Sequence, residues 1–295
     1  MRSGPIAALS RDGLTLHLQH GPTDLIITAE GVPGARERAF ERSALALRGV
    51  IEELVGELAE LRRSAVAGPE VVGSVARRMV AATSHFGDVF VTPMAAVAGA
   101  IADHVLAAAW ADDLERLSVN NGGDIAFGLA NGASTRIGVV TSLLTPSVTG
   151  SITIDSASSV RGVATSGWRG RSFSLGIADA VTVVAANAAT ADAAATVIAS
   201  AVDLPGHPAI VRVPATQVDE SSDLGDRLVT REVGTLSESE QAEALEPGVT
   251  LAHALLQSGV IAGAHLVIGE THVTLRHGSE GSFLEQGLAL SGDLG

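Results

Sequence analysis

The stretch NNGGDIAF at residues 120–127 combines two glycines with a single acid, Asp124. Asn-Gly and Gly-Asp pairs are ordinary hairpin-turn dipeptides, so a tight turn is the simpler interpretation. Bare glycine backbone beside a carboxylate also suits a site where a phosphate or a metal ion approaches the main chain. The sequence leaves both interpretations open.

A second polar pair is Asp192 and Thr196, four residues apart in the segment TADAAATVIASAV (190–202). On a helix this spacing places a carboxylate and a hydroxyl on one face. Such oxygens are ligands that Mg²⁺ accepts, with phosphate oxygens and water completing the shell. An acid in a first helical turn also complements the helix dipole without binding anything.

A third group follows the segment ATSG (164–167), where Ser166 is a candidate nucleophile that would need a partner base. Arg169 and Arg171 stand in the next Gly/Ser-rich stretch, and their guanidinium groups suit phosphate or carboxylate. His85 and His104 are candidate general bases because histidine titrates near neutral pH. A solvated arginine and a structural histidine are the simpler alternatives.

The elements that must position these residues follow from hydrophobic period. The sequence predicts a hairpin over 14–31, joined by HGPT. It predicts helices over 33–63 (with a bend at Gly49 or Gly56), 71–86 and 91–116, and then strands from LSV, DIAFGLA, TRIGVVTS and GSITID. The prediction continues with a long loop over 162–180, a strand over 181–187 and a helix over 190–202 with Thr190 as N-cap. It ends with an acidic surface segment over 203–248, a helix at LAHALLQSG and a closing hairpin. Ala95, Ala98, Gly99 and Ala102 form a smooth face for another backbone or a flat ligand.

We therefore expect a single α/β (α+β) domain over 1–295, with a mainly antiparallel sheet packed against helices, because the strands follow one another through short turns. The hydrophobic fraction of 46% allows a large core. The mean hydropathy of +0.33 suggests heavy burial and a homo-oligomer interface.

Composition excludes several kinds of chemistry. The chain has no cysteine, which rules out disulfides and thiolate sites, and all 19 basic residues are arginine, which rules out lysine nucleophiles and a P-loop lysine. The net charge of −14 and 3% aromatics argue against nucleic-acid binding. No run of about 18 apolar residues predicts a membrane span, and no signal sequence is visible, so we expect a cytoplasmic protein.

The order GGD, TSG and a VTVVA strand leading into an ADAAAT helix resembles the ApbE family, the FAD:protein FMN transferases, and especially its cytoplasmic, uncharacterised branch. The resemblance implies the ApbE-like fold, a flavin nucleotide (FAD or FMN) as ligand, and Mg²⁺ held by Asp192, Thr196 and the carbonyl of Ala95. Gly99 and Asp103 match the family's helix glycine and acid. The resemblance also implies that Gly122, Gly123 and Asp124 line the flavin pocket, with Thr165, Ser166 and Gly167 beside it. We therefore expect catalytic roles for Asp124, Ser166 and His85. The expected cofactor-binding residues are Thr92, Met94, Asn121, Gly122, Gly123, Thr165, Gly167, Arg169 and Arg171.

The chain departs from the family pattern where the family has a lysine (here Ala98), a His…Asp-Pro-x-Thr-Gly segment (here RSFSLGIADA) and a tyrosine (absent). The fold and a polar pocket are therefore implied more directly than FMN transfer. Three hypotheses follow. The first is an enzyme that binds a small anionic molecule and performs Mg²⁺-assisted phosphoanhydride cleavage or group transfer. The second is a metal-free hydrolase or isomerase of a small carboxylate or heterocycle with an arginine clamp, and the third is a non-catalytic ligand-binding subunit.

Overall fold

The computed structural model describes residues 4–140, 148–276 and 283–286. The chain divides into two compact units that alternate along the sequence. The first unit comprises the chain up to Thr135, Asp155–Ala164 and Val184–Ala193, and the second comprises Arg136–Ile154, Thr165–Val183 and the chain from Ala194 onward. The expectation of a single domain over 1–295 stays a prediction.

The first unit contains an antiparallel sheet whose strands lie in the order β1-β2-β3-β4-β5, with the start of β8 beside β5. The alternation of apolar and polar residues along the strands explains how this sheet forms. In β2, Leu16 and Leu18 point inward and are buried, whereas His17 between them is exposed. The strands are β1 (Ile6–Leu9), β2 (Thr15–His20), β3 (Thr23–Gly31), β4 (Leu114–Asn121), β5 (Asp124–Leu129) and β8 (Gly162–Ser166).

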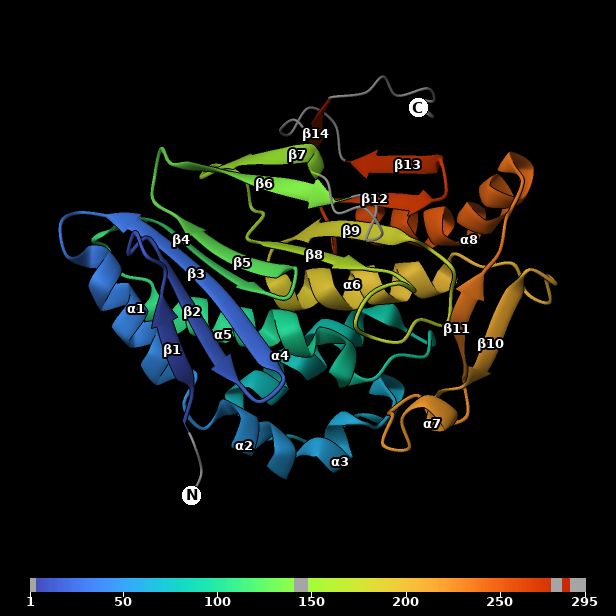
Figure 1. Ribbon diagram of the computed structural model, residues 1–295, viewed down its shortest axis with the longest axis horizontal. Coiled ribbons are helices and arrows are strands. Elements are labelled where there is room, and N and C mark those ends of the chain that lie inside the picture. The colour runs from blue at the N-terminus through green and yellow to red at the C-terminus, as the bar shows by residue number, and fades with distance from the viewer. Residues whose placement is uncertain (1–3, 141–147, 277–282, 287–295) are drawn as a thin grey trace. The chain divides into compact units, whose positions relative to one another are not determined.

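Helices pack against this sheet, with α1 (Ala35–Ala46) on β3 and α5 (Val97–Ala109) on β4 and β5 (Figure 1). The Ala-rich sequence of α5 lets it lie close to its neighbours. The remaining helical segments of this unit are α2 (Val50–Gly56), α3 (Leu58–Leu61), η1 (Ala65–Ala67), α4 (Ser74–Thr83), η2 (Ser84–Phe86), η3 (Pro93–Ala96) and the first residues of α6 (Ala188–Ala201).

The helical stretch predicted over 33–63 is three helices rather than one bent helix. Gly49 precedes α2 with a φ of 80°, a left-handed conformation that glycine adopts without strain. The chain therefore turns after α1, as the sequence suggested for this glycine. The helix predicted over 91–116 is shorter, because Trp110 leaves helical geometry and β4 begins at Leu114.

The second unit is built around β9 (Ala180–Ala185) and the hairpin of β12 (Gly263–Ile268) and β13 (Thr271–Arg276), on which α8 (Glu238–Gln257) packs (Figure 1). The strands β8, β9, β12 and β13 are neighbours in that order. Two smaller sheets pair β10 with β11 and join β14, β7 and β6. Their bounds, with α7, are β6 (Ser134–Val140), β7 (Val148–Asp155), β10 (Ile210–Pro214), α7 (Ala215–Val218), β11 (Leu228–Val233) and β14 (Phe283–Gln286).

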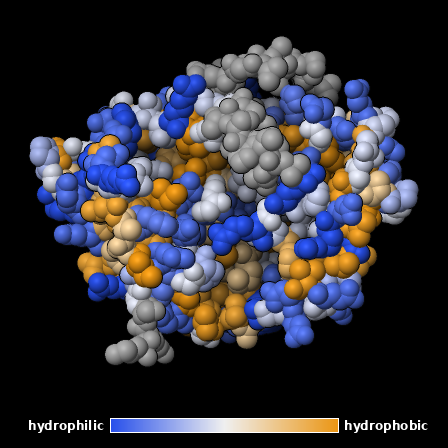
Figure 2. Space-filling view, in the orientation of Figure 1, coloured by the Kyte–Doolittle hydropathy of each residue, from blue (hydrophilic) through white to orange (hydrophobic). Residues whose placement is uncertain are grey.

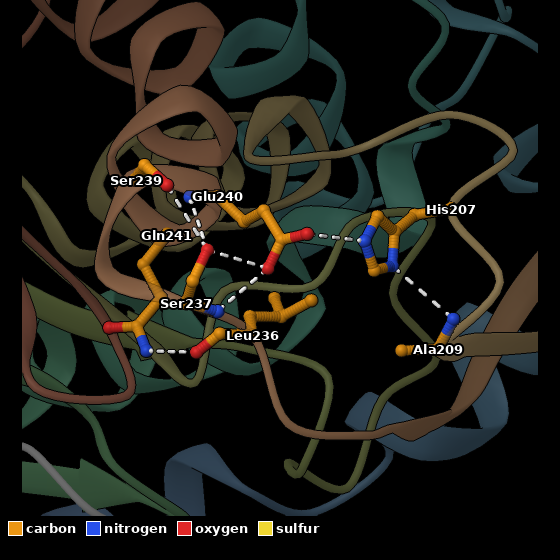
Figure 3. Close-up of polar contacts among 7 residues, drawn as sticks. All are labelled: His207, Ala209, Leu236, Ser237, Ser239, Glu240 and Gln241. Atoms are coloured by element: carbon orange, nitrogen blue, oxygen red, sulfur yellow. Dashed lines mark hydrogen bonds and ion pairs between the residues drawn. The ribbon is translucent and has the colours of Figure 1, made fainter.

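A capping box starts α8. The Ser237 hydroxyl accepts from the Glu240 N–H, while the Glu240 carboxylate accepts from the Ser237 N–H at 2.7 Å (Figure 3). His207 Nε2 lies 3.0 Å from the other carboxylate oxygen, so the loop before β10 is held to the helix start. Hydrogen bonds from the backbone and hydroxyl of Ser237, and then from His207, lower the pKa of Glu240 to about 2.

Two local predictions for this part of the chain were wrong. The loop predicted over 162–180 begins with strand β8, and the helix predicted at LAHALLQSG begins earlier, at Glu238. The acidic segment over 203–248 lies mostly at the surface, and it contains β10, α7, β11 and half of α8. Pro247 and Gly248 lie inside α8 although this pair is typical of a helix end. A Cβ on Gly248 would lie 2.5 Å from Val202, so close packing holds this part of α8 in place.

The prediction of a mixed α/β fold with a mainly antiparallel sheet is confirmed. Among the helices of the described residues, none combines the length and apolar character that crossing a bilayer requires.

Candidate functional site

The NNGGD stretch is the two-residue turn between β4 and β5. Asn121 pairs with Asp124 across the ladder, and the two glycines between them have φ values of 68° and 117°. Positive φ at both positions is what a tight hairpin of this kind requires, which explains both glycines. The Gly123 N–H donates to Asn120 Oδ1 at 2.8 Å. The turn interpretation is therefore correct, and the turn also fixes the position of Asp124.

The hairpin turn is tied to the N-terminus of α5. Asn121 Nδ2 donates to the Ala98 carbonyl at 3.1 Å, and Asn121 is buried. The Gly99 N–H, in the first turn of α5, donates to Asp192 Oδ2 at 3.0 Å. Free N–H groups and the helix dipole favour a carboxylate at such an end. The first unit thus brings Asn121, Asp124 and Asp192 into one neighbourhood.

Asp192 is the most electrostatically perturbed residue of this neighbourhood. Burial raises its pKa well above the usual value, and the nearby negative charge of Asp124 raises it further. The N–H groups of Gly99 and Ala98 act in the opposite direction without cancelling these effects. Two acids that disfavour each other's charge are typical of functional sites, although structural groups also show such shifts.

A second acid, Asp103, makes the converse contact between α5 and α6. Asp103, on α5, accepts from the Ala188 N–H at 3.0 Å and from the Ala189 N–H at 2.9 Å, at the start of α6. Each helix therefore supplies the carboxylate that satisfies N–H groups of the other. Burial raises the pKa of Asp103 despite these two hydrogen bonds.

The start of α6 corrects the predicted N-cap. The side chain of Asn187 accepts from the Thr190 N–H at 2.8 Å, so the cap is Asn187 and the helix begins before Thr190. The surroundings of Gly99 also show what packs against the smooth face of small residues to which it belongs. A Cβ there would lie 2.3 Å from the Ala188 carbonyl oxygen, so at this point the neighbour is backbone.

The other residues predicted near the metal are on η3 and α6. Thr92 is buried before η3, and its carbonyl accepts from the Ala95 N–H at 3.0 Å, while Met94 and Ala95 are half-buried. Thr196 follows Asp192 on α6, but the boundary between the units falls after Ala193. The ligand set that the resemblance implies, Asp192, Thr196 and the Ala95 carbonyl, therefore stays a prediction.

The TSG residues form a separate group in the second unit. Thr165 and Thr182 share a hydrogen bond of 2.9 Å between their hydroxyls, and Ser166 is half-buried at the end of β8. A Cβ on Gly167 would lie 2.4 Å from the Asp179 carbonyl, which explains why the third residue of TSG is glycine. The role of Ser166 as a nucleophile stays a prediction.

Asp179 organises the loop after β8, although no sequence motif singled it out. Asp179 Oδ1 accepts from Arg169 Nε at 2.9 Å and from Trp168 Nε1 at 3.1 Å, while Oδ2 accepts from the Gly269 N–H at 2.8 Å. The Arg169 guanidinium also lies 4.1 Å above the Trp168 ring. The only signal in the sequence is an acid directly before a buried strand.

The remaining candidates are Arg171, His85 and His104. Arg171 is exposed in the loop after β8, and His85 is exposed on η2. His104 is half-buried on α5, 3.4 Å from the Ser74 hydroxyl, and burial lowers its pKa. Their predicted roles stay predictions.

Among the residues that the structure describes, no group of three or more His, Asp or Glu side chains is arranged to hold a metal ion. A metal ion bound near Asp192 would take one carboxylate ligand from Asp192, with the Asp124 carboxylate nearby. Such a donor set suits Mg²⁺, which is commonly held by one or two carboxylates together with substrate phosphates and water.

Comparison with known proteins gives one family and several relatives. The model of the family described as AbpE bacteria matches residues 7–278. A UPF0280 protein of Methanothermobacter thermautotrophicus is 36% identical over 162 residues, covering 52% of this chain and 56% of the relative. A UPF0280 protein of Methanosarcina acetivorans is 36% identical over 137 residues, covering 46% and 52%. The matched region spans about half the length of these curated relatives.

Among solved structures, the apo form of the Pseudomonas stutzeri flavinyl transferase ApbE matches with a TM-score of 0.37 and 17% identity, covering 84% of this chain and 73% of that one.

Proposed function

The chain belongs to the AbpE bacteria family, and from this premise we propose that it is an enzyme that binds a phosphate-bearing small molecule, a flavin nucleotide such as FAD, and cleaves its phosphoanhydride bond with Mg²⁺. The observation that carries the proposal is Asp192. Its carboxylate is fixed at the start of α5 by the Gly99 N–H and lies near a second acid, Asp124.

The charges around Asp192 support the proposal that a Mg²⁺ ion binds there. Burial and the charge of Asp124 disfavour the ionised form of Asp192, and a bound cation favours that form. Phosphate near two carboxylates is repelled unless a cation lies between them. Asp192 is the residue that would hold the ion, and the ion would supply charge neutralisation for the phosphate oxygens.

The residues of this chain have separate roles in the proposed reaction. The Gly122–Gly123 turn sets the position of Asp124, and Asn121 joins the turn to α5. An oxygen of water or of an acceptor hydroxyl bonds to the phosphorus on the flavin side, the phosphoanhydride bond breaks, and AMP leaves. We assign Asp124 to take the proton of the attacking oxygen.

The metal-free alternative receives less support. It depends on an arginine clamp, but Arg169 already donates to Asp179 and stacks on Trp168. Its charge is therefore compensated within the protein, which weakens its attraction for a ligand anion.

The test is AMP release from FAD by the purified protein, with and without Mg²⁺. We expect release only with Mg²⁺, and we expect Asp192→Asn and Asp124→Asn each to lower the rate by about 100-fold or more, the usual cost of losing an electrostatic group at the reacting centre. The control is Asp112→Asn, which changes an exposed acid before β4.

Equal loss of activity in Asp112→Asn would show a general charge effect and contradict the assignment. FAD binding, seen as a thermal shift, without AMP release would support the non-catalytic hypothesis instead. Neither binding nor release would reject a flavin nucleotide as the ligand.

A further inference from the structure

Strand β1 forms one end of the first-unit sheet and is apolar throughout. It pairs with β2 in an unbroken antiparallel register, from Ile6 opposite Gln19 to Leu9 opposite Leu16. All four of its residues, IAAL, are exposed, with Ile6 and Leu9 at 68% and 62%. Figure 2 shows apolar side chains on the visible surface over the region of β1 and β2. Burying this strand would remove apolar surface from water.

The hydrogen-bond pattern shows which backbone groups of β1 face away from β2. The Ser10 N–H donates to the Thr15 carbonyl, so these two residues form a hydrogen-bonded pair. Hydrogen-bonded and non-hydrogen-bonded pairs alternate along an antiparallel ladder. Ala8 and Ile6 therefore bond to β2, whereas the N–H and C=O groups of Ala7 and Leu9 point to the outer edge.

This edge has few of the features that protect exposed strands from pairing. Natural edge strands are commonly blocked by charges, bulges or proline within the strand. β1 contains no charge and no proline, and its pairing with β2 shows no register shift. In the sheet order of the described residues, β1 has a neighbour on the β2 side alone.

We propose that β1 pairs with β1 of a second copy of this chain, in antiparallel register about a two-fold axis that passes between the two Ala8 residues. In this register Ala7 of each copy lies opposite Leu9 of the other, so all four outward-facing residues join hydrogen-bonded pairs. The two Ala8 residues form the close, non-hydrogen-bonded pair at the axis, where a small side chain fits. A two-fold interface of this kind is closed and does not propagate into fibres.

A second copy fits the edge because the strand is complementary to itself in this register. Ala7, Ala8 and Leu9 face the same three residues of the other copy, and Ile6 faces Ser10, so every pair is uncharged although the whole chain carries a net charge of −14. The pairing continues the first-unit sheet across the axis into the other copy.

The first test is the mass of the protein in solution, by sedimentation over a range of concentrations, for the wild type, Ala7→Pro and Ala7→Val. Proline removes the outward N–H of Ala7 without removing a bond to β2, whereas valine keeps it. We expect a concentration-dependent dimer for the wild type and Ala7→Val, and a monomer for Ala7→Pro with an unchanged circular dichroism spectrum and melting temperature.

A wild type that stays monomeric at every concentration would overturn the proposal, and so would a folded Ala7→Pro variant that stays dimeric.

The second test uses the absence of cysteine from the chain. Directly opposite residues in a non-hydrogen-bonded pair have Cβ atoms about 4.5–5.5 Å apart, close to disulfide range. Under oxidised glutathione, we expect Ala8→Cys to form a covalent dimer and Ala7→Cys to form little, because Ala7 lies opposite Leu9. Cross-linking through Ala7→Cys in preference to Ala8→Cys would refute this register.

Discussion

Two buried acids on facing helices have different environments and therefore different roles. The Asp103 carboxylate accepts hydrogen bonds from two backbone N–H groups at the start of α6, and these two bonds stabilise its ionised form. Asp192 accepts from the Gly99 N–H, but it is buried and lies near the negative charge of Asp124. Asp192 is therefore the acid whose ionised form has most to gain from a bound cation.

Asp192 is expected to make the stability of the metal-free protein depend on pH. An acid whose folded pKa is raised contributes stability that is present below its unfolded pKa, near 3.8, and is lost as pH rises through the folded pKa. Asp192→Asn removes this ionisation but keeps an oxygen for the Gly99 N–H. In urea unfolding with EDTA, its free energy of unfolding should exceed that of the wild type increasingly as pH rises, by about 1.4 kcal/mol for each unit of pKa difference.

The charges of Asp124 and Asp103 raise the pKa of Asp192, so the difference between the two profiles reports the ionisation of Asp192 together with its coupling to these two acids. The exposed variant Asp112→Asn should follow the wild-type profile. Parallel pH profiles for wild type and Asp192→Asn would show that the Asp192 carboxyl is not perturbed in the folded protein.

At the scale of elements, the crossing of α5 and α6 holds the first-unit site together. Gly99 allows the Ala188 carbonyl to approach α5, and the reciprocal bonds of Asp103 and Asp192 depend on this approach. A glycine within a helix ordinarily costs about 1 kcal/mol relative to alanine, so its presence here needs a reason in the packing.

Gly99→Ala is therefore expected to destabilise the protein, by about 1–3 kcal/mol, because the new Cβ would lie 2.3 Å from a backbone oxygen. The matched control is Gly56→Ala at the end of α2, where no atom lies within 4 Å of the added Cβ. The control should be neutral or slightly stabilising. Urea unfolding measures both, and equal stability of the two variants would contradict the close crossing.

At the scale of the whole molecule, the two units are interleaved, since each consists of three separate stretches of chain. Neither unit corresponds to one continuous segment, so neither can be formed by simply cutting the chain. We therefore expect them to unfold together, as a single domain does.

The two tryptophans test this prediction, since Trp110 lies in the first unit and Trp168 in the second. Trp168→Phe leaves a reporter packed near Gly128, and Trp110→Phe leaves one bonded to Asp179. In each variant, urea unfolding followed by fluorescence should coincide with unfolding followed by circular dichroism. Separate transitions in either variant would show that the units are independent domains.

Much of the fold could be predicted from local pattern. Period-two alternation identified β2, β3, β12 and β13, and helical period with small residues identified α5 and α6. The glycines of the β4–β5 turn were identified because tight turns require positive φ. These features depend on residues close together in sequence, which is why one sequence suffices to predict them.

By itself, then, the sequence determined the mixed α/β class, the order of most elements, the family and the acids worth testing. Only the tertiary structure decided that α8 continues through Pro247, that β8 is a strand, that Asp103 and Asp192 serve each other's helices, and that Asp179 organises the second unit. Each of these depends on a contact between residues distant in the chain, where packing and burial override local preference.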